Sequence, residues 1–127
     1  MTMRTEQIWV YREPERVSPS QPITGYGVEA ADGSIGKIDE ATYDVGSSYL
    51  VIDTGPWIFG KKVMLPAGIV ERVDHDDRMV FVFVSKDEIK NAPEFDETAY
   101  RGNQYRNELG TYYEPFYERD NAAARMR

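Results

Sequence analysis

The sequence predicts an all-β fold: a small antiparallel β-barrel with one short helix and an aromatic C-terminal extension. Three observations lead there. About six short apolar runs follow one another over residues 24–97, turn residues separate them, and no long helical pattern intervenes. The chain has 127 residues, of which 41% are hydrophobic and 29% charged, and this composition suits a single globular domain.

Three regions of the chain differ in texture. Residues 1–23 form an N-terminal arm with three prolines, which exclude a long helix, and one strand-like run over residues 7–12. Residues 24–97 form the predicted barrel domain. Residues 98–127 form a tail that is rich in aromatic residues and arginine, and we expect Gly110 and Pro115 to interrupt any long helix there.

Local sequence signals predict each element of the barrel domain. Asp32-Gly33 is a strong hairpin signal, and Gly36 in the returning strand predicts a bulge or sharp bend. Ser85 and Glu88 have the spacing of a capping box, which predicts a short helix over residues 86–91 that stops before Pro93. Further strands are expected over residues 48–54, 62–65, 69–73 and 79–84.

The last of these strands is apolar on both faces. Met79, Phe81 and Phe83 alternate with three valines, so both faces should be covered. A small barrel covers only the inner face. The outer face therefore needs another cover, which could be the aromatic tail, the N-terminal arm or a second subunit.

Charge and composition exclude several classes of function. The net charge is −7; residues 1–23 sum to 0 and residues 99–127 to +1, which leaves −8 for the middle. An acidic barrel repels phosphate backbones and anionic membranes. The absence of cysteine excludes disulfides and thiolate metal sites, and the first apolar run is too short for a signal peptide or membrane span. We therefore expect a cytoplasmic protein without membrane insertion, nucleic acid or cofactor.

Residues 25–95 resemble the PRC-barrel domain, which is shared by the cytoplasmic part of the photosynthetic reaction-centre H subunit and the C-terminal half of RimM-type ribosome-maturation factors. Five stretches carry the resemblance: Gly25-Tyr26-Gly27-Val28, the hairpin Asp32-Gly33-Ser34-Ile35-Gly36-Lys37-Ile38, Tyr49-Leu50-Val51-Ile52-Asp53-Thr54-Gly55, Lys61-Lys62-Val63-Met64-Leu65-Pro66, and Ser85-Lys86-Asp87-Glu88-Ile89-Lys90-Asn91-Ala92-Pro93-Glu94-Phe95. The chain is most similar to small stand-alone bacterial members. The resemblance implies a docking or adaptor module, with no catalytic residues to carry over.

Three local patterns suggest chemistry, and each has a plainer structural explanation. Residues 55–62 approach a phosphate-binding loop, but Lys62 stands where Ser or Thr would hold Mg²⁺. His75 lies among aspartates in a turn, and a lone histidine does not make a zinc site. Asp53 ends an apolar strand, where a carboxylate typically accepts backbone N–H bonds from the following turn. No nucleophile with a base can be assembled, so we expect no enzyme.

The candidate contact residues are aromatic. A loop carries two of them and the tail carries five, and they are Trp57, Phe59, Tyr105, Tyr112, Tyr113, Phe116 and Tyr117. Tyrosine and arginine together are typical of interface cores. The loop aromatics could cap the barrel or form an exposed knob for a partner. The tail aromatics could pack on the chain's own barrel, across a twin subunit or on a client protein.

The sequence thus favours a non-catalytic, self-associating adaptor, expected as a homodimer or other homo-oligomer with unknown protein partners. The alternative is a ribosome- or RNA-associated assembly factor, by analogy with the RimM-type proteins. Arginine and aromatic side chains can stack on single-stranded RNA, although the acidic barrel opposes this use. A small-ligand binder would require a pocket with convergent polar groups.

Overall fold

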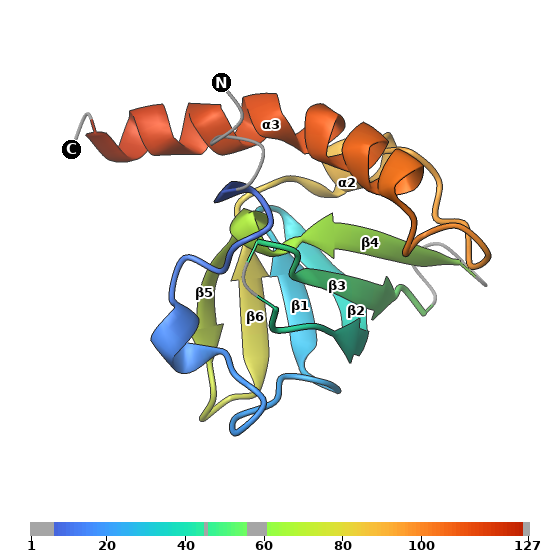
Figure 1. The fold of residues 1–127 in the computed structure, drawn as a ribbon. Helices are drawn as coiled ribbons and strands as arrows, with labels where there is room; N and C mark the ends of the chain where they lie inside the picture. The colour runs from blue at the N-terminus through green and yellow to red at the C-terminus, as the bar shows by residue number, and fades with distance from the viewer. Residues whose placement is uncertain (1–6, 45, 56–60, 126–127) are drawn as a thin grey trace.

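The computed structural model describes residues 7–44, 46–55 and 61–125, which form a six-stranded sheet with a long helix across one end (Figure 1). Two short 3-10 helices and one short α-helix complete the described fold. The elements in chain order are η1 (Pro14–Arg16), β1 (Gly27–Ala30), β2 (Gly33–Ala41), β3 (Tyr49–Asp53), β4 (Lys62–Pro66), η2 (Ala67–Ile69), β5 (Val70–Asp74), β6 (Met79–Val82), α2 (Lys86–Lys90) and α3 (Asn103–Arg125).

The predicted closed antiparallel barrel is wrong: the sheet is open and mixed. Its strand order is β4-β3-β2-β1-β6-β5, and the neighbours β1 and β6 run parallel. The other four neighbouring pairs are antiparallel. The edge strands β4 and β5 do not pair with each other, so the ladder does not close.

The sheet is nevertheless strongly curled, because a very short segment joins its two edges. Only η2 lies between β4 and β5, and its three residues are buried. Four Cα–Cα steps span at most about 15 Å, whereas the edges of a flat six-stranded sheet lie about 24 Å apart. The edges therefore approach each other at one corner. Pro66, which has no N–H to donate, ends β4 there.

The local turn chemistry was predicted correctly. The Asp32-Gly33 turn joins β1 to β2, and the register shifts within the ladder opposite Ile35, beside Gly36. The capping box before α2 is present: the Ser85 hydroxyl accepts from the Glu88 backbone, and the Glu88 carboxylate accepts from the Ser85 N–H.

Residues 103–125 of the tail form a single helix, so the expected interruption at Gly110 and Pro115 is wrong. α3 runs for 23 residues through both positions. A Cβ on Gly110 would lie only 3.2 Å from Trp9 Nε1, so the glycine allows the indole ring to pack against the helix. Pro115 and Thr111 are exposed, and water can therefore reach the carbonyl that the proline leaves without a helical partner.

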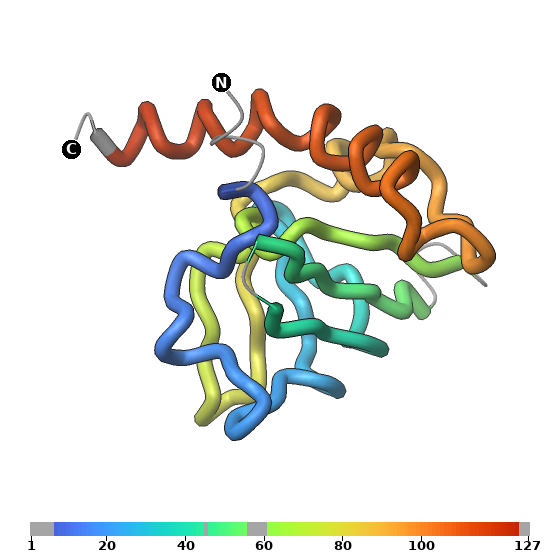
Figure 2. Tube along the Cα trace, viewed as in Figure 1, coloured from blue at the N-terminus to red at the C-terminus, as the bar shows by residue number. Residues whose placement is uncertain are grey.

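Within residues 7–12, Ile8, Trp9 and Tyr11 are buried, but the segment forms turns and not the expected strand. The Ile8 carbonyl accepts from Gly68 N at 2.7 Å, and the Trp9 carbonyl accepts from Ser48 N at 2.9 Å. Figure 2 shows this N-terminal segment passing beneath α3 and then descending on the β5 side of the sheet. Ile8, Trp9 and Tyr11 of this segment therefore belong to the hydrophobic core.

The chain itself covers the outer face of β6. The Arg72 guanidinium lies 3.9 Å from the Phe81 ring centroid. The Arg12 guanidinium lies 4.6 Å from the ring of Phe83 and 4.8 Å from that of Tyr117 on α3. Arg72 of β5 thus lies over Phe81 in β6, and Arg12 of the N-terminal segment lies over Phe83 just after the strand and contacts Tyr117 of the tail.

Candidate functional site

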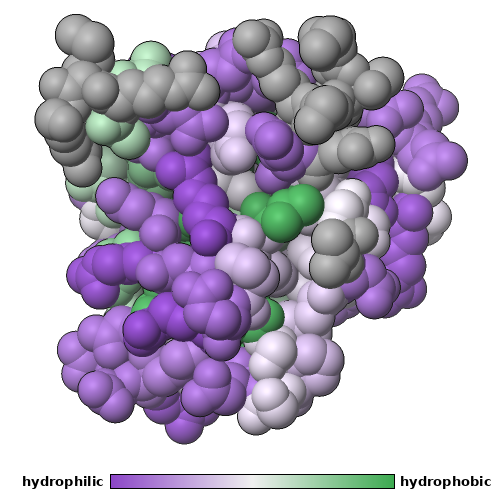
Figure 3. Space-filling view, turned by 60° about the vertical axis from the view of Figure 1, so that its left-hand side comes forward, coloured by the Kyte–Doolittle hydropathy of each residue, from purple (hydrophilic) through white to green (hydrophobic). Residues whose placement is uncertain are grey.

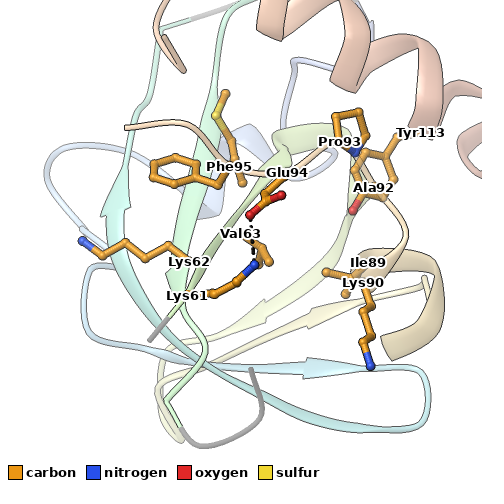
Figure 4. Close-up of a pocket in the computed structure, with 11 residues that line it drawn as sticks. Lys61, Lys62, Val63, Ile89, Lys90, Ala92, Pro93, Glu94, Phe95 and Tyr113 are labelled. Carbon is orange, nitrogen blue, oxygen red and sulfur yellow. Dashed lines mark hydrogen bonds and ion pairs between the residues drawn. The ribbon is translucent and has the colours of Figure 1, made fainter. Parts of the chain in front are cut away.

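A groove lies beside the first residues of β4, between that strand, α2 and α3 (Figure 4). We call it the β4 groove and define it by residues 61–64, 89–90, 92–95 and Tyr113. Its volume is about 250 Å³. A second hollow of about 280 Å³ shares Lys61, Lys62, Glu94 and Phe95 with it and extends to Glu97.

The elements around the groove fix its shape. The capping box begins α2, whose Ile89 is buried in the core and also lines the groove. The segment after α2 is held at two points: the Tyr105 hydroxyl donates to the Pro93 carbonyl at 3.3 Å, and Lys61 pairs with Glu94 at 2.9 Å. A wall of residues 92–95 therefore stands opposite β4.

The rim carries both signs of charge. Lys62 Nζ lies 2.9 Å from Asp39 and 3.8 Å from Glu97, and the hydrogen bond to Asp39 raises the pKa of Lys62. The side chains of Lys61 and Glu94 are 55% and 78% exposed, so their ion pair contributes little and can separate. In Figure 4 this pair lies between Phe95 and Tyr113.

Tyr113 forms the inner end of the groove. Its side chain is fully buried, and its hydroxyl has no hydrogen-bond partner among the described residues. Burial raises the pKa of Tyr113 well above 10, so the group remains a neutral hydroxyl. Figure 4 shows the ring beside Pro93, with the hydroxyl end turned toward the groove.

A second polar cluster, around Glu40, is fully satisfied by its own partners. Its carboxylate accepts from the Tyr49 hydroxyl at 2.9 Å and the Tyr100 hydroxyl at 2.8 Å, and Arg101 lies 3.4 Å away. Burial alone would raise the pKa of Glu40, but the hydrogen bonds from Tyr100, Tyr49 and Arg101 outweigh it and lower the pKa. The cluster ties the segment before α3 to β2 and leaves no group free for chemistry.

The two titratable residues singled out from the sequence have structural roles. Asp53 Oδ1 accepts from the Gly55 backbone at 3.0 Å, as predicted. His75 Nε2 lies 2.6 Å from the Arg16 carbonyl, and Nδ1 lies 2.7 Å from the Tyr26 hydroxyl. Because a carbonyl only accepts, Nε2 donates, and in the neutral ring Nδ1 accepts from Tyr26. Both ring nitrogens are therefore engaged.

The structure separates the aromatic candidates into three groups. Tyr105 and Tyr113 are buried against the chain's own core, whereas Tyr112, Phe116 and Tyr117 are half-buried. Trp57 and Phe59, with most of the rejected phosphate-loop pattern, lie outside the described residues. Only Tyr113 lines the β4 groove.

The sequence did not predict the groove itself. Its lining comes from β4, α2, the segment after α2 and α3, which only the tertiary fold brings together. The doublet Lys61-Lys62 was visible in an otherwise acidic region, but nothing in the sequence placed Tyr113 or Phe95 near it. Helical spacing of Tyr105, Leu109 and Tyr113 could have identified the buried face of α3 once the helix was accepted.

Other surfaces give weaker candidates. Figure 3 turns the left side of Figure 1 forward, and the described atoms on that face are mostly hydrophilic, with small separate hydrophobic areas. Within the part of the chain that the structure describes, no three His, Cys, Asp or Glu side chains gather closely enough to hold a metal ion. No described helix combines the length and apolar character that a membrane span needs.

Comparison with known proteins found no family model that matches the chain and no curated protein that matches it. The resemblance to PRC-barrel domains therefore stays a prediction from the quoted motifs. The function must be argued from the geometry of the groove.

Proposed function

We propose that this chain is a non-catalytic protein-interaction module that binds an extended segment of a partner protein along the β4 groove. One observation carries the proposal: β4 is an edge strand, and its first residues line a groove instead of pairing with a seventh strand among the described residues. An edge strand offers unpaired backbone N–H and C=O groups, to which an extended peptide can add.

The form and charge of the groove support this occupant. The two hollows share Lys61, Lys62, Glu94 and Phe95, and the second continues to Glu97, so the depression lies between the start of β4 and the segment after α2. A depression flanked by a strand edge suits an extended chain. Lys61 and Lys62 face Glu94 and Glu97 across the depression. Alternating charges of this kind set the orientation and register of a bound segment more than its affinity.

The polar groups that the structure describes favour binding over catalysis. His75 is the only histidine of the chain, both of its ring nitrogens are engaged, and it does not line the groove. The Glu40 carboxylate is held by its own hydrogen bonds. Self-association is not part of the proposal, because the rings of Phe81 and Phe83 that suggested it lie against Arg72 and Arg12 of the chain itself.

The test uses a phage-displayed library of random peptides, selected on the full chain. Ala92 lines the groove and is only partly buried, so Ala92→Phe should fill the groove with a ring while the fold is retained. The matched control is Ala123→Phe, at an exposed position of α3 outside the groove. Circular dichroism and thermal melting confirm that both variants are folded.

Selected peptides should bind wild type and Ala123→Phe equally and Ala92→Phe at least 10-fold more weakly, because the introduced ring occupies their site. Amide hydrogen exchange in β4 should slow when such a peptide binds, since strand addition protects the edge N–H groups. A library that yields no binders, or binders that ignore Ala92→Phe, contradicts the proposal.

A further inference from the structure

The inner end of the β4 groove holds a hydroxyl that the fold leaves unsatisfied. Three tyrosines of α3 reach the neighbourhood of α2. The Tyr105 hydroxyl donates to the Pro93 carbonyl and the Tyr112 hydroxyl to the Glu88 carbonyl, but the Tyr113 hydroxyl has no partner among the described residues. Buried hydroxyls are nearly always hydrogen-bonded, and leaving one without a partner costs free energy.

The surroundings of this hydroxyl define what could satisfy it. The walls nearby are apolar and come from Val63, Ile89, Ala92 and Phe95. A volume of about 250 Å³ is far larger than the roughly 30 Å³ share of one water molecule, so the groove can take a side chain. An occupant therefore needs an apolar body with a hydrogen-bonding atom at its inner end.

The charges around the groove exclude an anionic tip. Glu94 lies over the groove on Lys61, and Lys62 is engaged by Asp39. Lys90 also lines the groove, but Figure 4 shows its amino group pointing away from Tyr113. A carboxylate inserted beside Tyr113 would therefore lose its hydration without a cation next to it, and this burial is costly. A neutral group avoids that cost.

An aromatic body fits these walls better than an aliphatic one. Phe95 and Tyr113 both present rings to the groove, and a third ring can make edge-to-face or offset contacts with them. Such ring clusters already stabilise this region: Phe95 lies 4.9 Å from Tyr100 and 6.5 Å from Tyr105 between ring centroids.

We infer that the β4 groove takes a tyrosine-type anchor from the bound segment, a neutral aromatic ring whose oxygen hydrogen-bonds to the Tyr113 hydroxyl. This inference rests on the proposed binding of a partner segment in the same groove. It adds the chemical identity of the anchor residue. It also gives Tyr113 a role in ligand recognition that the core position of its ring alone does not require.

The experiment measures binding of phenol, toluene and benzoate to the full chain by ¹H–¹⁵N chemical-shift titration. Phenol and toluene have similar shape and differ in one hydroxyl. Phenol should bind wild type about 5-fold more tightly than toluene, the equivalent of one ordinary hydrogen bond. Benzoate should bind more weakly than phenol, because its carboxylate must be desolvated.

Two conservative variants isolate the hydroxyl. In Tyr113→Phe, the preference for phenol over toluene should fall to about 1-fold. In Tyr112→Phe, which removes the neighbouring hydroxyl that bonds to Glu88, the 5-fold preference should remain. An unchanged preference in Tyr113→Phe shows that water satisfies the hydroxyl and overturns the inference, as does benzoate binding most tightly or no shift at groove residues with any probe.

Failure of the inference and failure of the proposed function give different results. Phenol preference that depends on Tyr113, together with a peptide library that yields no binders, supports the anchor chemistry and refutes the peptide partner. If the selected peptides bind wild type, bind Ala92→Phe more weakly and share no aromatic residue, the result supports the protein-interaction module and refutes the tyrosine-type anchor.

Discussion

Replacing Arg12 with methionine should destabilise the protein by about 3 kcal/mol, although the residue lies outside the groove. The Arg12 guanidinium contacts the rings of Phe83 and Tyr117, pairs with Asp120 at 2.6 Å and donates through Nε to the Gly68 carbonyl at 3.0 Å. It therefore joins the N-terminal segment, the end of β6, the corner at η2 and the last turns of α3.

The magnitude follows from these contacts. Each ring contact contributes about 0.5–1 kcal/mol, and the charged hydrogen bonds together contribute about 1.5–3 kcal/mol. The Arg12 and Asp120 side chains are each only 23% exposed, so solvent screens their pair less than a fully exposed one. Methionine keeps most of the apolar stem, and the loss therefore reports on the guanidinium.

Urea denaturation measures the free energy of unfolding, with Arg16→Met as control. Arg16 lies in the same segment with an exposed side chain, and its replacement should change stability by less than about 0.5 kcal/mol. A double-mutant cycle of Arg12→Met with Asp120→Asn should give a coupling of about 1 kcal/mol. Equal effects of the Arg12 and Arg16 substitutions would refute the reasoning.

Three further predictions concern the sheet, the capping box and the tail. Gly36→Ala should lower the free energy of unfolding, measured in urea, by more than about 3 kcal/mol, because the new Cβ would overlap the Asp53 carbonyl oxygen. The control Gly46→Ala, whose Cβ meets nothing within 4 Å, should cost about 1 kcal/mol. Equal costs would contradict the close approach of β2 and β3 at Gly36. Burial alone would raise the pKa of Glu88, but hydrogen bonds from Arg119 and the Ser85 backbone outweigh it and lower the pKa. A lowered carboxyl pKa contributes stability that is present above the unfolded pKa of 4.5 and is lost as the pH falls through the folded pKa. The melting temperatures of wild type and Glu88→Gln should therefore differ at pH 7 and converge below pH 4.5. A difference that stays constant with pH would show that ionised Glu88 does not stabilise the fold. Removal of residues 98–127 should make the remaining chain aggregate, because α3 covers Trp9 and the corner at η2. Light scattering and thermal melting test this. A fragment that stays monodisperse and equally stable would show that the tail is not a cover.

Local signals in the sequence were sufficient to predict most strands, the turn at Asp32-Gly33 and the capping box that begins α2. Alternating apolar residues, the Asp32-Gly33 pair and the Ser85–Glu88 spacing each act over fewer than ten residues, and the structure contains the hairpin and the capping box. Alternation does not specify which strands become neighbours. The parallel pairing of β1 with β6 joins residues about fifty positions apart, and no local pattern encodes it.

The long helix was missed because propensity was weighed without its packing partners. Gly110 and Pro115 disfavour an isolated helix, but α3 gains the burial of Tyr105, Leu109 and Tyr113 against the sheet. The candidate site was missed for a related reason. Tyr113 was named as an aromatic contact residue, but the lack of a partner for its hydroxyl depends on the exact position of α3 over α2.

The Arg12–Asp120 pair also constrains how the chain can be made. The two residues are 108 positions apart, so during synthesis the carboxylate partner of Arg12 is added only after more than a hundred further residues. Contacts of such high sequence separation slow folding, because a long loop must close before they form. Until then the guanidinium that lies over Phe83 has neither Asp120 nor the Tyr117 ring beside it, and this incompletely covered region is one that chaperones can recognise.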